Sequence, residues 1–156
     1  MIGGKQKRRV FLWSAILILN LAFIWGNSLL PAQISSAFSI FIRNLLAALF
    51  PGSNQQTDPS AGHGLLRKIA HVLEFCSLGF LLCGLLRAVQ KAAFLSLPLG
   101  VIVGSIDECI QLFVPGRGPH IRDVLIDTLG VIAGIGVFTI ALIIRKRKKQ
   151  LILEDN

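Results

Sequence analysis

The sequence predicts an all-α, polytopic membrane protein with four transmembrane helices. Four apolar blocks, over about residues 10–26, 65–86, 92–114 and 124–144, are each long enough to cross ~30 Å of hydrocarbon as a tilted helix. Because lipid offers the backbone no hydrogen-bond partners, blocks of this kind are expected to be helices rather than strands. The chain of 156 residues then forms one membrane domain over residues 1–150, and residues 145–156 form a basic cytoplasmic tail.

The basic residues indicate how the chain is oriented. They gather before the first block, between the second and third, and after the fourth: Lys5, Lys7, Arg8, Arg9, Arg87, Lys91, Arg145, Lys146, Arg147, Lys148 and Lys149. Positive residues stay on the cytoplasmic side, so we expect a bacterial inner-membrane protein with both termini in the cytoplasm. The net charge of +8 is accounted for by this distribution, and we expect membrane lipids rather than nucleic acid as partners.

The connections between the blocks are also expected to differ in kind. Residues 34–50 have apolar positions at helical spacing and predict a short amphipathic helix on the outer membrane surface. Residues 51–64 are rich in turn-forming residues and predict an external loop. We expect Pro98 to kink the third span and Asp123 to cap the helix of the fourth.

Two stripes of polar and small residues should face the interior of the bundle. One stripe in each of the last two spans follows the same helical spacing: Gly100, Gly104, Asp107 and Gln111, then Asp123, Asp127, Gly130 and Gly134. Glycines four residues apart let helices approach closely in lipid. The spans run in opposite directions, so both stripes place their polar residues toward the outside.

The second span begins with the stretch "RKIAHVLEF", in which Lys68, His71 and Glu74 lie three residues apart and share one side of a helix. The carboxylates of Asp107, Glu108 and Asp127 belong to the same outer half of the membrane, whereas the inner half is almost free of charge. The sequence therefore predicts a polar funnel that is open to the outside and closed below by apolar packing.

These motifs resemble those of the VanZ-like family, named for a membrane protein associated with resistance to teicoplanin. The family pattern is approximately K-x-x-H-x-x-E-F, D-E-x-x-Q-x-x-x-P-x-R and D-x-x-x-[ND]-x-x-G. It falls here on Lys68, His71, Glu74, Phe75, Asp107, Glu108, Gln111, Pro115, Arg117, Asp123, Asp127 and Gly130. "WGNSLLPAQISSAFS" is similar to the serine-rich motif after the family's first span. Asp127 stands where many relatives carry Asn. The resemblance implies a cell-wall lipid precursor, or the glycopeptide antibiotic itself, as the ligand class.

The polar residues have three interpretations. As structural contacts they would contribute only about 0.6–2 kcal/mol each, less than the roughly 2.5–3.5 kcal/mol that a charge at a helix centre costs. As a binding site, the cluster would hold a polar head group from the outer leaflet through Lys68, Gln111, Arg117, Asp123 and Asp127. This is the interpretation that we favour.

As a catalytic site, the cluster would act as a membrane hydrolase or transferase. Glu74 would orient His71 as a general base, and Asp107 or Glu108 would serve as the acid. His71, Glu74, Asp107 and Asp127 would alternatively hold a divalent ion, but a single H-x-x-E motif is weak support, so we assign no metal and no cofactor. A small dimeric exporter is the last alternative. An exporter needs polar groups that can be reached from both sides of the membrane, and here the polar residues belong to the outer half alone, which counts against it. A homo-oligomer is a further possibility.

Overall fold

The computed structural model describes residues 3–49, 59–118 and 120–154, and in these residues the protein consists of helices without strands. The elements in chain order are α1 (Gly4–Ser28), α2 (Ala32–Leu49), α3 (Pro59–Ala88), the 3-10 helix η1 (Ala93–Leu95), α4 (Ser96–Gln111) and α5 (Ile121–Glu154). Four segments are long and apolar enough to cross a membrane: Gly4–Ser28, Arg67–Ala88, Ala93–Gln111 and Ile121–Leu153. The all-α fold with four candidate membrane spans is confirmed.

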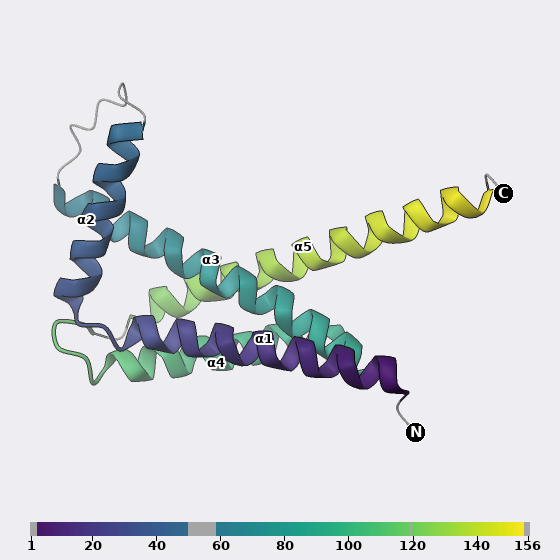
Figure 1. The fold of residues 1–156 in the computed structure, drawn as a ribbon. Coiled ribbons are helices and arrows are strands. Elements are labelled where there is room, and N and C mark those ends of the chain that lie inside the picture. The colour runs from purple at the N-terminus through teal and green to yellow at the C-terminus, as the bar shows by residue number, and fades with distance from the viewer. Residues whose placement is uncertain (1–2, 50–58, 119, 155–156) are drawn as a thin grey trace.

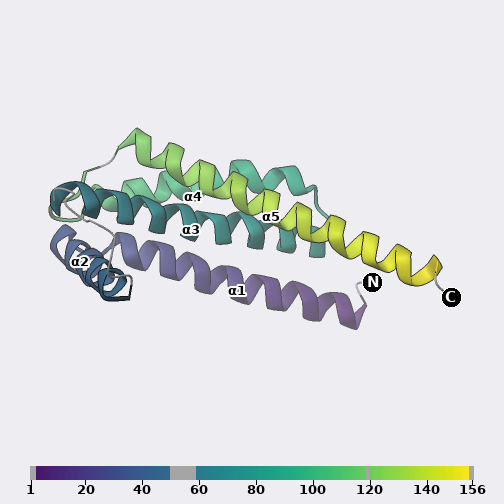
Figure 2. The same cartoon turned by 90° about the horizontal axis from the view of Figure 1, so that it is seen from above.

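The bundle is arranged around α3, which contacts α1, α4 and α5 (Figure 1). Helices α1, α3 and α4 lie side by side, whereas α5 crosses α3 obliquely and continues away from the bundle (Figures 1 and 2). The first and last described turns lie at the same end of the bundle, as the charge distribution requires (Figure 2). The opposite end carries α2, the start of α3 and the connection between α4 and α5.

Close packing between helices follows from the small residues of the predicted stripes. A Cβ atom added at Gly134 would collide with the backbone oxygen of Cys76, and one at Gly130 would lie 2.7 Å from the backbone oxygen of Val72. Gly100 leaves space in the same way for Val131. Without a hydrophobic driving force between helices in lipid, such close backbone contact is a main source of association. The prediction that the glycines face the bundle is confirmed.

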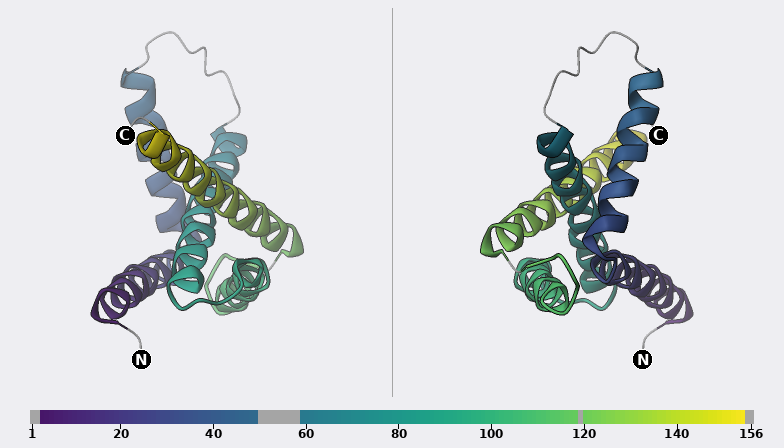
Figure 3. Two further views of the ribbon diagram at one scale, coloured as in Figure 1. Left: turned by 90° about the vertical axis from the view of Figure 1, so that its right-hand side faces the viewer. Right: turned by 90° about the vertical axis from the view of Figure 1, so that its left-hand side faces the viewer.

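The expected amphipathic helix is α2, which follows the turn at Pro31. It runs crosswise to the bundle rather than along it (Figures 1 and 3), and its apolar residues Ile34, Phe41 and Leu45 are exposed. A crosswise helix at one end of a bundle is the arrangement that a membrane-surface helix needs. That it rests on the outer surface stays a prediction.

Four details of where the helices begin and end differ from the sequence-based expectation. Pro98 lies in the first turn of α4, where a missing N–H breaks no intrahelical bond, so no interior kink arises. Asp123 is likewise in the first turn of α5 rather than at its cap, and its N–H donates to the oxygen of His120 at 2.7 Å. The expected loop over residues 51–64 ends early because α3 begins at Pro59; residues 51–58 are outside the described residues. Finally, α5 continues through the basic residues to Glu154.

Candidate functional site

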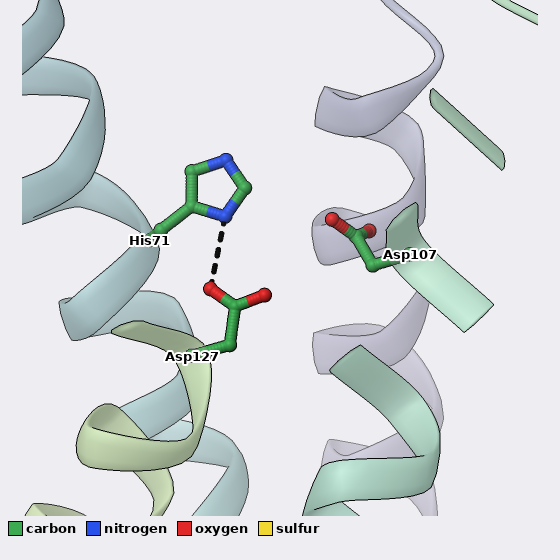
Figure 4. Close-up of side chains that lie close together, drawn as sticks. All are labelled: His71, Asp107 and Asp127. Atoms are coloured by element: carbon green, nitrogen blue, oxygen red, sulfur yellow. Dashed lines mark hydrogen bonds and ion pairs between the residues drawn. The ribbon is translucent and has the colours of Figure 1, made fainter. Parts of the chain in front are cut away.

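The centre of the candidate site is formed by His71 from α3, Asp107 from α4 and Asp127 from α5 (Figure 4). One side-chain nitrogen or oxygen from each lies within 4.8 Å of the others. His71 Nδ1 is 3.2 Å from Asp127 Oδ1. An ionised carboxylate only accepts hydrogen bonds, so with Asp127 ionised His71 Nδ1 is the donor in this contact. Asp107 and Asp127 are 0% and 1% exposed, so both carboxylates are removed from solvent.

Asp107 is held in place by donors from two helices. The Ser28 hydroxyl, at the end of α1, donates to Asp107 Oδ2 at 2.8 Å, and the Gln111 amide donates to the same oxygen at 3.0 Å. The His71 ring is fixed separately, since it stacks on Phe75 with centroids 6.4 Å apart and an interplanar angle of 6°. These contacts fix the positions of the groups at the centre of the site.

Glu74 does not orient His71, and the sequence-based expectation on this point is wrong. Its Oε1 atom instead accepts a hydrogen bond of 2.8 Å from the Asn27 amide of α1. The side chain that contacts His71 is Asp127. The spacing of three residues does place His71 and Glu74 on one side of α3. However, α1 and α5 pack on different parts of that side, so Glu74 is bound by a residue of α1 and His71 by a residue of α5.

Glu108 and Arg117 connect the site to the segment between α4 and α5. Glu108 Oε2 accepts a hydrogen bond of 2.8 Å from the backbone N–H of His120. Burial lowers the pKa of Arg117 and nearby Arg67 lowers it further, while the carboxylates of Asp107 and Glu108 oppose the shift. A guanidinium remains cationic in proteins despite such shifts. Arg117 therefore supplies a half-buried positive charge beside the carboxylates.

Lys68 and Asp123 lie on the rim of the site. Together with Arg67, His71, Ile126 and Asp127 they line a cavity of about 10 Å³. This volume holds about one water molecule. The wide funnel expected from the sequence is therefore a narrow opening in this structure. The Lys68 side chain is exposed, so it lies at the mouth of the cavity rather than at its centre.

Several buried polar atoms in the site have no hydrogen-bond partner among the described residues. They are Asp107 Oδ1, Glu108 Oε1, Arg117 Nε and Asp127 Oδ2. Leaving a buried polar group unpaired costs about 1–3 kcal/mol, and more for a charged group. A cluster that served only to hold the helices together would be expected to pair these atoms. These four atoms therefore keep unused hydrogen-bonding capacity in the described structure.

The sequence-based reasoning missed Asn27 and Ser28 as site residues. Both are polar, adjacent and at the end of an otherwise apolar span, just before Pro31. That placement was a usable signal, because polar residues at such depth usually face a partner. Asn20 was missed as well: its amide donates to the Ser77 hydroxyl at 2.7 Å, deeper in the bundle.

The family model of VanZ/LLP1 matches residues 10–143, which is most of the chain. No curated protein and no solved structure gives a significant match. The matched range contains the second and third candidate spans completely, most of the first and the fourth, and every residue of the site described above. The chain belongs to the VanZ/LLP1 family, which is linked to teicoplanin resistance.

Proposed function

We propose that the cluster around His71, Asp107 and Asp127 binds the polar head group of a cell-envelope amphiphile, either a cell-wall lipid precursor or a lipoglycopeptide. The observation that carries the proposal is the set of unpaired buried atoms on Asp107, Glu108, Asp127 and Arg117. Groups that are buried, charged and unpaired gain most when a ligand supplies the missing partners. The site would be reached from the outer leaflet, given the basic residues at the opposite end of the bundle.

The chemistry of the free groups favours a head group with both acidic and donor functions. Arg117 can bind phosphate or carboxylate with two parallel hydrogen bonds. Arg67 and Lys68, which line the rim cavity, add positive charge at its mouth. The buried carboxylates and Gln111 would accept hydrogen bonds from hydroxyl, amine or amide groups, which sugars and peptides carry. This mixture suits glycosylated or peptide-bearing phospholipids better than a simple phosphate.

An apolar groove offers a place for the chain of such an amphiphile. The groove, of about 620 Å³, lies among α1, α3 and α5 and is lined mainly by apolar side chains, among them Phe23, Leu73 and Val137. These three side chains are between 52% and 64% exposed, so the groove opens sideways to the surrounding lipid. Leu73 precedes Glu74 on α3, so one part of the groove lies at the same level along the helix as Glu74. An acyl or polyprenyl chain would occupy this groove with its head group in the cluster.

The proposal is tested by binding of a polyprenyl-pyrophosphate-linked wall precursor to the protein in lipid nanodiscs, measured by native mass spectrometry. Arg117→Gln should weaken binding by about 10- to 100-fold, since it removes charged hydrogen bonds of roughly 1.5–3 kcal/mol in total. Arg122→Gln is the matched control, because Arg122 is exposed at the same end of the bundle and outside the cluster. Its binding should stay within about twofold of the wild type.

The proposal fails if Arg117→Gln binds as tightly as Arg122→Gln. It also fails if a neutral diacylglycerol competes as well as the charged precursor, because the groove alone would then account for binding. A lipoglycopeptide antibiotic, used as the second probe, decides between the two ligand sources.

A second candidate function is acid–base chemistry on the bound head group. It is favoured by the contact of His71 Nδ1 with Asp127 Oδ1, which leaves Nε2 of the imidazole as the nitrogen that can accept a proton. Incubating the purified protein with the precursor and examining the lipid for a change in mass tests this function. Conversion that is lost in His71→Gln while binding persists would support it, and an unchanged lipid mass would exclude it.

A further inference from the structure

We infer that His71, Asp107 and Asp127 form a binding site for a divalent transition-metal ion, with Zn²⁺ and Mn²⁺ as the ions that fit best. The inference concerns the floor of the polar cluster and holds whichever amphiphile binds at its rim. It starts from geometry: three different spanning helices each contribute one side chain, and one ligand atom from each lies within 4.8 Å of the other two. Figure 4 shows the imidazole and both carboxylates turned toward one another.

The separation is close to what an ion needs. Zn²⁺ binds nitrogen and oxygen ligands at roughly 2.0–2.2 Å, which places neighbouring ligand atoms of a tetrahedral site roughly 3.4 Å apart. Small side-chain rotations would bring the three atoms from their present separations to that value. The ion would bind the lone pair of His71 Nδ1 in the neutral imidazole. The proton now on Nδ1 would move through solvent to Nε2, so the ring stays neutral.

The free oxygens provide an independent reason to expect an ion. Asp107 Oδ1 and Asp127 Oδ2 are buried and have no hydrogen-bond partner among the described residues, although each carboxylate is held through its other oxygen. Two such carboxylates with one imidazole carry excess negative charge unless they are protonated. Within the described part of the chain, no lysine or arginine forms an ion pair with either of them. A divalent cation would supply both the missing charge and the missing partners.

The surroundings resemble the supporting contacts that metal ligands require. Ser28 and Gln111 fix one oxygen of Asp107, and Phe75 fixes the plane of the His71 ring. Such outer contacts orient the ligands of a metal site. The rim cavity of about 10 Å³, lined by His71 and Asp127, is of a size for a single ion or water to enter. One imidazole with two carboxylates suits Zn²⁺ or Mn²⁺ better than Ca²⁺, which prefers oxygen ligands throughout.

Three protein ligands leave at least one coordination position open. In metal sites that act on ligands, this position holds water or an oxygen of the substrate. If the proposed function holds, this position would accept an oxyanion of the head group, and Asp107 and Asp127 would then contact the head group through the ion rather than directly. The sequence-based assignment of no metal rested on the weakness of a single H-x-x-E motif. Of the four residues considered there, His71, Asp107 and Asp127 lie together in the structure, whereas Glu74 is bound to Asn27.

The experiment measures metal binding with the ion alone. The full chain, carrying an affinity tag without histidine and a Cys109→Ser change that removes an exposed thiol, is stripped with chelator and titrated with Zn²⁺ and Mn²⁺. We expect about one ion per chain, as determined by mass spectrometry of the metal content, together with a rise in melting temperature. Asp107→Asn and Asp127→Asn should each weaken binding by about 100-fold or more, since even outer contacts contribute 10- to 100-fold.

Glu108→Gln is the matched control, because Glu108 is a buried carboxylate next to Asp107 that is outside the set of three ligands. This variant should bind the ion as the wild type does. An equal loss in Glu108→Gln, or full retention in Asp107→Asn and Asp127→Asn, would show that the ion is held elsewhere and would overturn the inference. Less than about 0.1 ion per wild-type chain at millimolar metal would also overturn it.

Electron spin-echo spectroscopy of bound Mn²⁺ tests the site without depending on the folding of carboxylate variants. A nitrogen coupling should be present in the protein that lacks His63 and His120, in which His71 is the remaining histidine. Absence of that coupling while Mn²⁺ is bound would exclude His71 as a ligand. Arg117→Gln removes a positive charge beside Asp107, so it should not weaken metal binding, whereas it should weaken binding of the head group. Failure of the proposed head-group binding and failure of the metal site therefore give different results.

Discussion

At the scale of single residues, the site depends on which oxygen of each carboxylate is occupied. Asp107 is fully buried, and both of its protein donors, Ser28 and Gln111, are bound to Oδ2. Oδ1 is thereby left free and held in a fixed direction. Asp127 shows the same division, with His71 on Oδ1 and no described partner on Oδ2. The supporting residues matter because they determine where the free oxygens point.

Replacing Ser28 by alanine should therefore destabilise the protein by about 1–3 kcal/mol, because a buried carboxylate loses a hydrogen-bond donor. Thermal unfolding in detergent micelles measures the change. Ser105→Ala is the matched control, since the Ser105 hydroxyl is exposed and bonds only to the oxygen of Val101 in its own helix. Its effect should stay within about 0.5 kcal/mol. Equal melting of the two variants would contradict the role given to Ser28.

The hydrogen-bond partners of individual side chains were the features least predictable from the sequence. Helical spacing correctly places Lys68, His71 and Glu74 on one side of α3, but it does not reveal that Glu74 bonds to Asn27. The choice between partners is made by the helices packed against α3, and this depends on tertiary contacts that a single helix does not encode. The role of Ser28 was hidden for the same reason: its partner lies 79 residues away in the sequence.

At the scale of elements, the crossing of α3 and α5 brings two of the three central side chains together. The crossing is close because Gly130 and Gly134 put no side chain between the helices. His71 on α3 and Asp127 on α5 lie next to this contact, because His71 precedes Val72 and Asp127 is one turn before Gly130. If the helices were further apart, the distance between the His71 and Asp127 side chains would increase.

Gly134→Ala should destabilise the protein by about 1–3 kcal/mol, because the added methyl group overpacks the interface against the backbone of Cys76. Gly136→Ala provides a control on the same helix, since a Cβ there meets nothing within 4 Å. The alanine should be neutral or slightly stabilising at that position. Melting temperatures of the two variants, measured side by side, check the prediction, and a tolerated Gly134→Ala would show that the crossing is looser than described.

The helical stripes were predictable because a 3.6-residue period and glycines four residues apart directly specify which face is buried. The residues at which the helices begin and end were less predictable. Pro98 was expected inside its helix, but α4 begins only two residues before it. The sequence offers no capping side chain at that point, since Leu95 occupies the N-cap without a side-chain hydrogen bond. Hydropathy placed the start of the span within one residue of Ala93, but it did not reveal that the span opens with a 3-10 turn before α4 begins.

At the scale of the whole molecule, apolar length and charge asymmetry determine the architecture. The four spanning segments and the crosswise α2 were predictable because each follows from the thickness and the surface of the bilayer. The width of the site could not be predicted in this way. The expected funnel is a narrow opening of about 10 Å³ in the structure. How far helices close around polar groups depends on side-chain packing, which composition does not specify.

The orientation of the bundle can be tested by labelling in intact cells. In a background where Cys76, Cys83 and Cys109 are replaced by serine, Gly118→Cys should react with a membrane-impermeant maleimide from outside. Gln150→Cys should react only after lysis, because the basic turns of α5 are expected in the cytoplasm. Gly118 has room for a side chain, as its nearest neighbour is 3.8 Å from an added Cβ. Labelling of Gln150→Cys in intact cells would reverse the orientation.

Because α5 continues without a break to Glu154, the two faces of the membrane are joined by one stiff rod. Asp127 is near its beginning, and Glu154 lies about 40 Å further along the axis at a rise of 1.5 Å per residue. A change of tilt of about 10° at the cluster would swing the far end through about 7 Å. Any change in the tilt of α5 at the cluster would therefore also move the cationic turns at the far end of the same helix.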